Sequence, residues 1–170
     1  GRKVYIVASG TDKVYQYRLR DLWDISTIEP ETSGTGSSAT NKSLDISSYE
    51  TNPHDLIFSY DGRRLFICGK NTTLSTDPDR VHHWELLTPW DITTATYRDY
   101  KEFGSSNQDP ISVAFSYAGD KIFVLDYIGV GEGKISEHTV NSNELYFYSN
   151  PYDVIAPDLD DGNIISAVDA

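Results

Sequence analysis

The strongest constraint on this chain is a seven-residue segment that occurs three times. It reads GRKVYIV at residues 1–7, GRRLFIC at 62–68 and GDKIFVL at 119–125, so the period is about 60 residues. Self-similarity at a fixed period of this size is the sequence signature of an architecture built from repeated supersecondary units. The repeat therefore decides the fold class before composition is considered.

Other pieces recur in the same order within each period. The stretch PHDLIFSYDG at 53–62 matches PISVAFSYAG at 110–119. Downstream of the glycines, DKVYQYRL at 12–19 matches DRVHHWEL at 79–86, with GKISEHTV at 133–140 as a weaker third copy. The three copies and a final strand occupy approximately residues 1–52, 53–109, 110–163 and 164–170.

Each copy predicts four short strands, a to d. Gly62 and Gly119 suit the turn between strands a and b, because glycine adopts positive φ without a steric penalty. Strand b is an apolar run suited to burial on both faces, and strand c alternates as a half-exposed strand does. The predicted strands are a at 55–59 and 112–116, b at 64–68 and 121–125, c at 14–19, 81–86 and 135–140, and d at 44–49, 97–103 and 145–148.

The predicted fold class is all-β, with about three four-stranded antiparallel blades of a β-propeller in a single domain over residues 1–170. Apolar inner strands and variable, polar outer strands are typical of such blades. No stretch has a long helical period or a capped helix start. Repeated hairpins in a sandwich or a solenoid are the structural alternative.

The order of the strands predicts association. The chain reads b-c-d, a-b-c-d, a-b-c-d, a, whereas closed propellers have four to eight blades. We therefore expect copies of the chain, or further sequence, to complete the ring and pair the open edges. The chain begins at Gly1 and contains no Met, which indicates a processed product or part of a longer one.

The repeat also predicts a core and a loop. Residues 29–42 are rich in Ser, Thr and Gly, and are expected to form a surface loop that tolerates deletion. The inner-strand positions expected to be most buried are Val4, Ile6, Phe58, Leu65, Ile67, Phe115, Ile122 and Val124.

Charge and composition exclude several classes of function. The formal net charge is −12, from 26 acidic and 14 basic residues, which argues against binding to nucleic acid or to an anionic membrane surface. No apolar run is long enough to span a membrane. We therefore expect no nucleic-acid partner and no membrane insertion.

No motif assigns catalytic, cofactor-binding or metal-binding residues. The single cysteine, Cys68, falls in a predicted core strand and is expected to act as a small hydrophobe. The chain has four histidines, His54, His82, His83 and His138. His82 and His83 are neighbours on one strand, so their side chains point to opposite faces. His82 and His138 do not hold equivalent positions, because His82 aligns with Ser136. We expect no cofactor and no enzymatic activity, and residues that contact a ligand or partner remain unassigned.

A Trp-Asp pair follows strand c in two copies, within LWDIST at 22–27 and PWDITT at 89–94, with PYDVI at 151–155 as a looser relative. The period is too long for Trp-Asp repeat propellers, whose repeats have about 40–45 residues, and no Gly-His pair precedes it. We expect Trp to pack between blades and Asp to cap the turn.

Together these phrases resemble repeat segments in structural proteins of tailed phages, especially marine and cyanobacterial ones. The matching residues are 113–119, 121–124, 12–17, Leu19 and 88–95. The first part of this match, residues 113–119 and 121–124, also resembles surface-layer and lactonase-like propeller repeats. The resemblance covers nearly the whole chain and implies the fold more specifically than the function, because propellers have many functions.

The resemblance implies a non-enzymatic virion module, structural or adhesive, that serves as a capsid decoration, tail or fibre component. Its expected partners are other virion proteins, copies of itself or a host-surface glycan, and its expected location is the virion, or else a secreted or cell-surface position. Two alternatives stay open, a carbohydrate-binding lectin and a lactonase-type enzyme with a metal in the central channel. The aromatic residues that favour a lectin, and that are expected to be exposed, are Trp84, Tyr97, Tyr100, Tyr146 and Tyr148.

Overall fold

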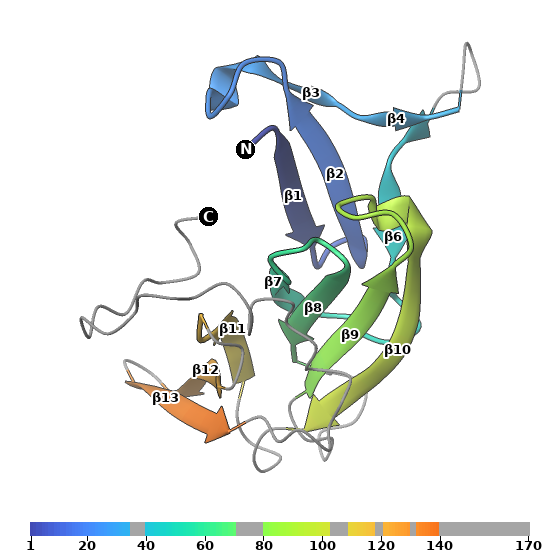
Figure 1. Cartoon of the computed structure of the whole chain (residues 1–170). Helices are drawn as coiled ribbons and strands as arrows, with labels where there is room; N and C mark the ends of the chain where they lie inside the picture. The colour runs from blue at the N-terminus through green and yellow to red at the C-terminus, as the bar shows by residue number, and fades with distance from the viewer. Residues whose placement is uncertain (35–39, 71–79, 103–108, 118–120, 130–131, 140–170) are drawn as a thin grey trace.

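The chain forms several antiparallel β-sheets in the computed structural model, which describes residues 1–34, 40–70, 80–102, 109–117, 121–129 and 132–139 (Figure 1). The described residues contain no α-helix, so the predicted all-β class is confirmed. None of the sheets formed by these described residues closes on itself. Within this described part, no helix has the length and apolar character needed to cross a membrane.

The second copy forms a complete four-stranded meander, which we call the second sheet. Its strands are β7 (Pro53–Phe58), β8 (Arg64–Gly69), β9 (Arg80–Leu86) and β10 (Ala95–Glu102), in the spatial order β10-β9-β8-β7. Gly62 lies in the β7–β8 turn with φ +68°. The predicted strands a to d of this copy are therefore confirmed, whereas Gly119 lies outside the described residues.

The first copy forms the first sheet, and its fourth strand differs from the prediction. β1 (Lys3–Ala8) pairs with β2 (Lys13–Leu19), and β2 pairs in turn with two short strands, β3 (Ile28–Pro30) and β6 (Ser43–Asp45). Strand d is thus divided in two, and a small hairpin of β4 (Thr32–Ser33) and β5 (Thr40–Asn41) projects between its halves.

The third copy contributes the third sheet, β11 (Asp109–Phe115), β12 (Lys121–Gly129) and β13 (Glu132–Thr139), in that order. These strands match the predicted a, b and c. The predicted strand d at 145–148 and the final strand at 164–170 fall outside the described residues.

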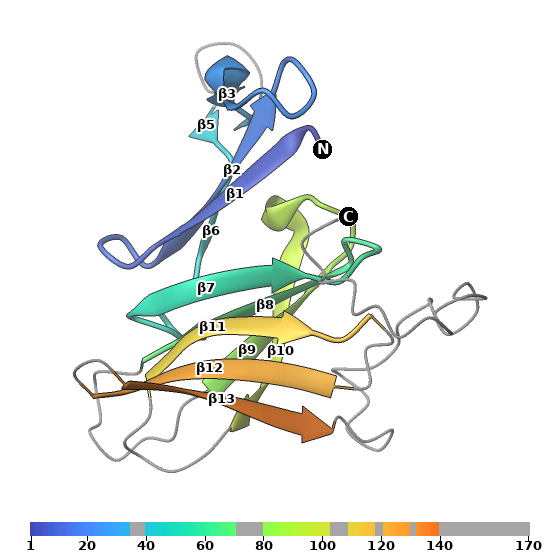
Figure 2. The ribbon, with the colours of Figure 1, turned by 90° about the vertical axis from the view of Figure 1, so that its left-hand side faces the viewer.

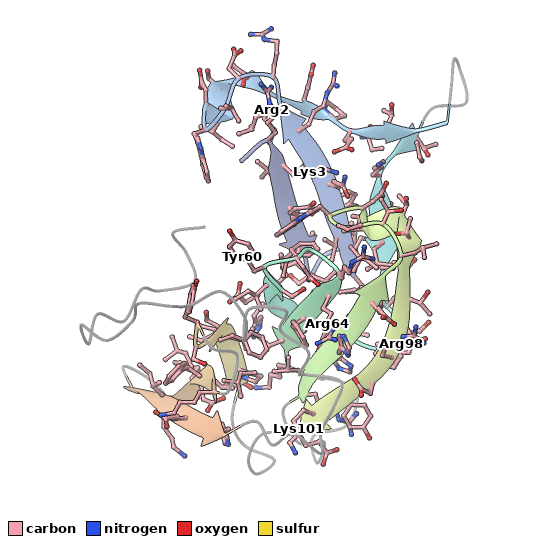
Figure 3. All side chains as sticks on the ribbon, in the orientation of Figure 1. Arg2, Lys3, Tyr60, Arg64, Arg98 and Lys101 are labelled. Atoms are coloured by element: carbon pink, nitrogen blue, oxygen red, sulfur yellow. The ribbon has the colours of Figure 1, made fainter. Side chains whose placement is uncertain are left out.

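All three sheets share one register between strands b and c. The paired residues that begin strand b are Lys3 with Arg18, Arg64 with Glu85, and Lys121 with Thr139. Lys3 and Arg64 are thus counterparts, and both lie on b strands in Figure 3. Each residue of one sheet can therefore be matched with its counterpart in the others.

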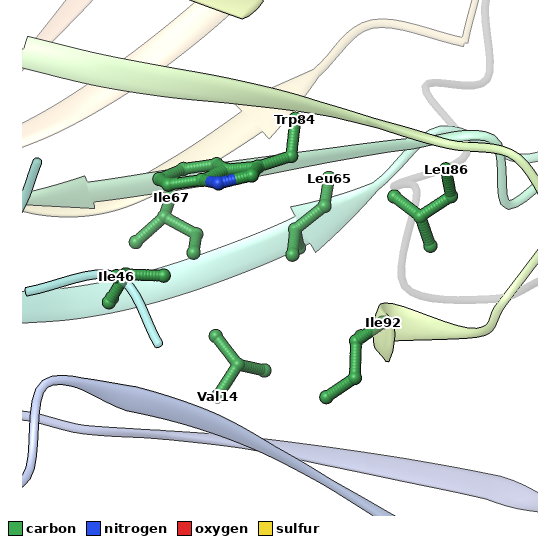
Figure 4. Packing of buried hydrophobic residues seen from close by; sticks show 7 residues of the cluster. All are labelled: Val14, Ile46, Leu65, Ile67, Trp84, Leu86 and Ile92. Carbon is green, nitrogen blue, oxygen red and sulfur yellow. The ribbon is translucent and has the colours of Figure 1, made fainter. Parts of the chain in front are cut away.

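The sheets lie one upon another in chain order, with β1 and β2 above, β7 between and β11 to β13 below in Figure 2. We call the face that a sheet turns to the next sheet along the chain its forward face, and the opposite face its backward face. The forward face of the first sheet, with Val7 and Val14, packs on the backward face of the second (Figure 4). The buried residues of this cluster are Val14, Ile46, Leu65, Ile67, Trp84, Leu86 and Ile92.

The next contact repeats this arrangement. The forward face of the second sheet, with Phe66, Cys68 and Val81, packs on Val113, Ile122 and Val124 of the third. One aromatic pair is reproduced in both contacts. The rings of Tyr5 and Phe58 are 4.4 Å apart at 46°, and those of their counterparts Phe66 and Phe115 are 4.8 Å apart at 53°.

The core predictions were right for the b strands of the second and third copies only. Leu65, Ile67, Ile122 and Val124 are at most 1% exposed, whereas Phe58 and Phe115 are only half-buried against the two clusters, so those two predictions were wrong. The predictions for the first copy were also wrong, because Ile6 is 45% exposed and Val4 only half-buried. Both lie on the backward face of the first sheet, which no described sheet covers.

Candidate functional site: the Trp-Asp turns and the sheet faces they meet

The Trp-Asp turns are tightly folded and nearly identical in backbone conformation. Trp23 and Trp90 have φ of 61° and 62°, in the left-handed region that non-glycine residues rarely adopt. Each following aspartate caps a short 3₁₀ helix, Ile25–Thr27 or Ile92–Thr94. The predicted capping role of the aspartates is therefore confirmed.

The capping bonds recur in both turns. Asp91 Oδ1 accepts from the Thr93 N–H at 3.1 Å and from the Thr93 hydroxyl at 2.7 Å. Asp24 Oδ1 accepts in the same way from Ser26, at 2.9 Å and 2.6 Å. The carboxylate thus satisfies a free N–H group at the start of the helix, and the hydroxyl of the same residue donates a second hydrogen bond to the carboxylate.

Each tryptophan also bonds to the glycine that precedes strand b. The Trp90 N–H donates to the Gly62 carbonyl at 2.9 Å, and the Trp23 N–H donates to the Gly1 carbonyl at 3.4 Å. The Trp90 ring then covers Gly62, where a Cβ atom would lie 2.3 Å from the indole. This contact explains why the glycine and the tryptophan recur together.

The second Trp-Asp turn (89–94) docks on the forward face of the first sheet. The Tyr5 hydroxyl donates to the Trp90 carbonyl at 2.6 Å, and Lys3 Nζ donates to the same oxygen at 3.0 Å. The Ile92 N–H donates to Oε1 of the buried Gln16 at 3.0 Å, and the Ile92 side chain is fully buried beside Val14. The turn therefore joins two sheets through Ile92, whereas the expected packing of the tryptophan between blades is wrong for Trp23, which is 75% exposed.

An ion network completes this contact. Lys42 Nζ lies 2.6 Å from Asp91 Oδ2 and 3.2 Å from Glu31 Oε1. The side chain of Lys42 is 13% exposed, that of Asp91 19% and that of Glu31 21%. Partial burial raises the pKa of Asp91, but the hydrogen bonds from Lys42 and Thr93 outweigh it, so the pKa lies below its ordinary value. Lys42 belongs to the segment predicted to be a passive surface loop, and that prediction was wrong for Glu31 and Lys42.

Replacing Lys42 with methionine is expected to lower the free energy of unfolding by about 2 kcal/mol, because two partly buried carboxylates lose a charged donor. The matched control is Arg18→Met, which removes an ion pair to Glu29 with side chains 61% and 40% exposed. It is expected to cost less than about 1 kcal/mol. Urea denaturation of both variants measures the difference, and equal losses would contradict a structural role for the Lys42 network.

The first Trp-Asp turn (22–27) has the same conformation but no described sheet against it. Trp23 is 75% exposed, Ile25 63% and Leu22 59%. Ile25 is the counterpart of Ile92, which is fully buried. The same local structure therefore presents apolar side chains to solvent in one copy and buries them in the other.

Two buried histidines are neighbours on β9, and their side chains point to opposite faces of the sheet, as the sequence predicts. His82 is 2% exposed, with Nδ1 3.3 Å from the Tyr97 hydroxyl and Nε2 3.8 Å from Glu50 Oε2. His83 stacks on Phe66 on the other face, with Nδ1 3.1 Å from Asp99 Oδ1. Burial lowers the pKa of His82 to about 4 and raises that of Glu50, so the neutral forms of both groups are favoured.

His82 makes the fold sensitive to acid. Folding lowers the pKa of His82 from 6.5 in the unfolded chain to about 4. The contribution of the neutral, buried His82 side chain to the stability of the fold is therefore complete above pH 6.5 and is lost as the pH falls toward 4. The expected loss is about 3 kcal/mol. Glu50 has a raised pKa and acts in the opposite direction, so the difference between wild type and His82→Gln isolates the histidine. Denaturant unfolding at several pH values measures it, and parallel profiles would refute the expectation.

The structure places the other candidate residues as follows. Cys68 is buried and its pKa is raised by burial, which agrees with the expected role as a small hydrophobe. Trp84 is 1% exposed in the core, so it was wrongly counted among exposed aromatics. Tyr97 stacks on Tyr49 at 3.7 Å, and Tyr100 is 46% exposed under Arg80. Tyr146 and Tyr148 lie outside the described residues.

The sequence did not predict the residues outside the second copy that contact the docked turn. Tyr5, Gln16 and Lys42 come from three separate strands or connections, and nothing in their order along the chain links them to Asp91 or Ile92. In the described part, no group of three or more His, Cys, Asp or Glu side chains is placed to hold a metal ion. Comparisons with protein-family models, with curated proteins and with solved structures found no match.

Proposed function

We propose that the three sheets are successive blades of a β-propeller and that the chain is a non-enzymatic structural or adhesive module of a tailed-phage particle. Its place would be a capsid decoration, a tail or a fibre, where it contacts other virion proteins, copies of itself or a host-surface glycan. A secreted or cell-surface position is the alternative location.

The observation that carries the proposal is the repeated sheet-to-sheet contact. Propeller blades are four-stranded sheets whose innermost strands lie next to one another around the axis. Strands a of the second and third copies approach in this way, because Asp55 Oδ2 accepts from the Ser112 hydroxyl at 2.7 Å and from the Val113 N–H at 3.1 Å. The His54 ring and the Pro110 carbonyl add a contact at 3.0 Å between the same strands.

The residues singled out by the sequence support a structural role. The repeated Gly, Trp, Asp and Ile positions of the second copy make turns and pack sheets together. The virion assignment is supported by the resemblance of those same phrases to phage repeat segments. The lectin alternative loses one of its proposed exposed aromatics, because Trp84 is a core residue.

The proposal is tested by asking whether the protein is part of purified particles. Virions from the source of the gene are banded by density gradient, digested with trypsin and analysed by mass spectrometry. We expect the tryptic peptides 4–13 and 122–134 at copy numbers comparable with other particle proteins. Finding them only in the soluble fraction of the lysate would overturn the virion assignment.

A further inference from the structure

We propose that the backward face of the first sheet, together with the first Trp-Asp turn, binds the forward face of the third sheet of a second copy of this chain. Two copies then pair through two such contacts. The inference rests on the proposed function insofar as it treats the sheets as blades, and it names the partner of an open blade face.

The backward face of the first sheet is an apolar surface. Its exposed hydrophobic residues gather on β1, the turn and β3, and are Ile6 at 45%, Leu22 at 59%, Trp23 at 75%, Ile25 at 63% and Ile28 at 38%. Contiguous exposed apolar surface marks interaction sites in soluble proteins. In the second copy, the counterparts Ile67, Ile92 and Ala95 all belong to the core cluster between two sheets.

The chain itself shows what covers such a face. The backward face of the second sheet meets Val14, Gln16 and Lys3 on the first, which supply an apolar contact to Ile92, an acceptor for its N–H and a donor to the Trp90 carbonyl. Because the first turn repeats the backbone of the second, it presents the Ile25 side chain and N–H and the Trp23 carbonyl in the same arrangement.

The forward face of the third sheet carries the matching groups. The shared register makes Ile135 the counterpart of Val14, Glu137 that of Gln16 and Lys121 that of Lys3. Ile135 is 71% exposed, so the apolar contact point is open. Glu137, like Gln16, has a side-chain oxygen that can accept from the Ile25 N–H. Lys121, like Lys3, has an ammonium group that can donate to the Trp23 carbonyl, and its Nζ lies 2.8 Å from Glu137 Oε1.

The two open faces differ, so they form a head-to-tail contact rather than a self-complementary one. Head-to-tail contacts close into a ring when the rotation between copies permits and otherwise give open filaments. Two copies with three sheets each give six blades, a number within the four to eight that close a propeller. The second copy is therefore the occupant that covers both open faces of each chain.

The inference is tested by measuring the molecular mass of the purified 170-residue chain in solution, by light scattering and sedimentation over a range of concentrations. A pair has twice the 19.1 kDa of one chain, about 38 kDa. Ile25→Lys and Ile135→Glu place charges at the centres of the two faces, at positions exposed enough to leave each chain folded. Each variant is expected to reduce the mass to that of one chain, and the double variant, which pairs Lys with Glu across both contacts, is expected to restore the pair.

The matched control is Leu87→Lys, an equally drastic change at a residue that is 82% exposed and lies on neither face. It is expected to leave the pair intact. A single-chain mass for the wild type at all concentrations would overturn the inference, as would a pair that survives both single variants or a larger polymer that both variants abolish. Particle association is measured independently, so detection of the peptides in virions with a monomeric chain would refute the pairing alone.

Discussion

Replacing Gly62 with alanine is expected to destabilise the fold by about 3 kcal/mol or more. Gly62 has φ +68°, where a Cβ atom costs about 1–2 kcal/mol through its clash with the backbone. That Cβ would also lie 2.3 Å from the Trp90 ring, so the indole must leave its place against Phe58. Overpacking of this kind adds about 1–3 kcal/mol.

The measurement is the free energy of unfolding from urea denaturation. Gly10→Ala is the matched control, because a Cβ at Gly10 meets nothing within 4 Å. We expect the control to stay within about 0.5 kcal/mol of wild type. A Gly62→Ala protein as stable as the control would show that the Gly–Trp contact does not hold the turn.

Truncating Ile92 to alanine is expected to cost about 2–5 kcal/mol, the range for large-to-small changes in packed cores. Ile92 is fully buried between the first and second sheets, in the cluster that contains Val14 and Ile46. The change opens a cavity at the point where the second Trp-Asp turn meets the first sheet, so it weakens the attachment of one sheet to the other.

Ile25→Ala is the matched control for this truncation, because Ile25 holds the same position in a turn of the same conformation but is 63% exposed. We expect a change within about 0.5 kcal/mol when the chain is kept dilute enough to be monomeric. Thermal unfolding of the two variants under identical conditions compares them. Equal losses would mean that the second turn is not buried against the first sheet.

The strands were predictable from the sequence because the repeat supplied independent copies of each one. Strands a, b and c of the second copy agree with the structure to within two residues, and the apolar run around Leu65 and Ile67 is buried as expected. The error at Ile6 has a physical cause. Its local sequence is that of a core strand, but burial depends on a neighbouring sheet, which the local pattern cannot reveal.

The candidate site was predictable only in part, for a related reason. The capping by Asp24 and Asp91 follows from residues two positions apart, so the sequence could indicate it. The pairing of Lys42 with Asp91 joins residues 49 positions apart, and Lys42 lies in a Ser- and Gly-rich segment whose sequence is typical of a linker. Contacts between sheets are set by how the copies stack, and strand periodicity carries no record of that.

The central claim is that the second Trp-Asp turn inserts into the forward face of the first sheet. It is tested most directly by nuclear Overhauser effects between labelled methyl groups of Ile92 and Val14, in the cluster shown in Figure 4. The Val7–Val14 pair, directly opposite within the first sheet, is the internal reference. We expect a cross-peak between Ile92 and Val14 that disappears in Ile92→Ala. A clear Val7–Val14 cross-peak with none from Ile92 to Val14 would contradict the stacking of the sheets.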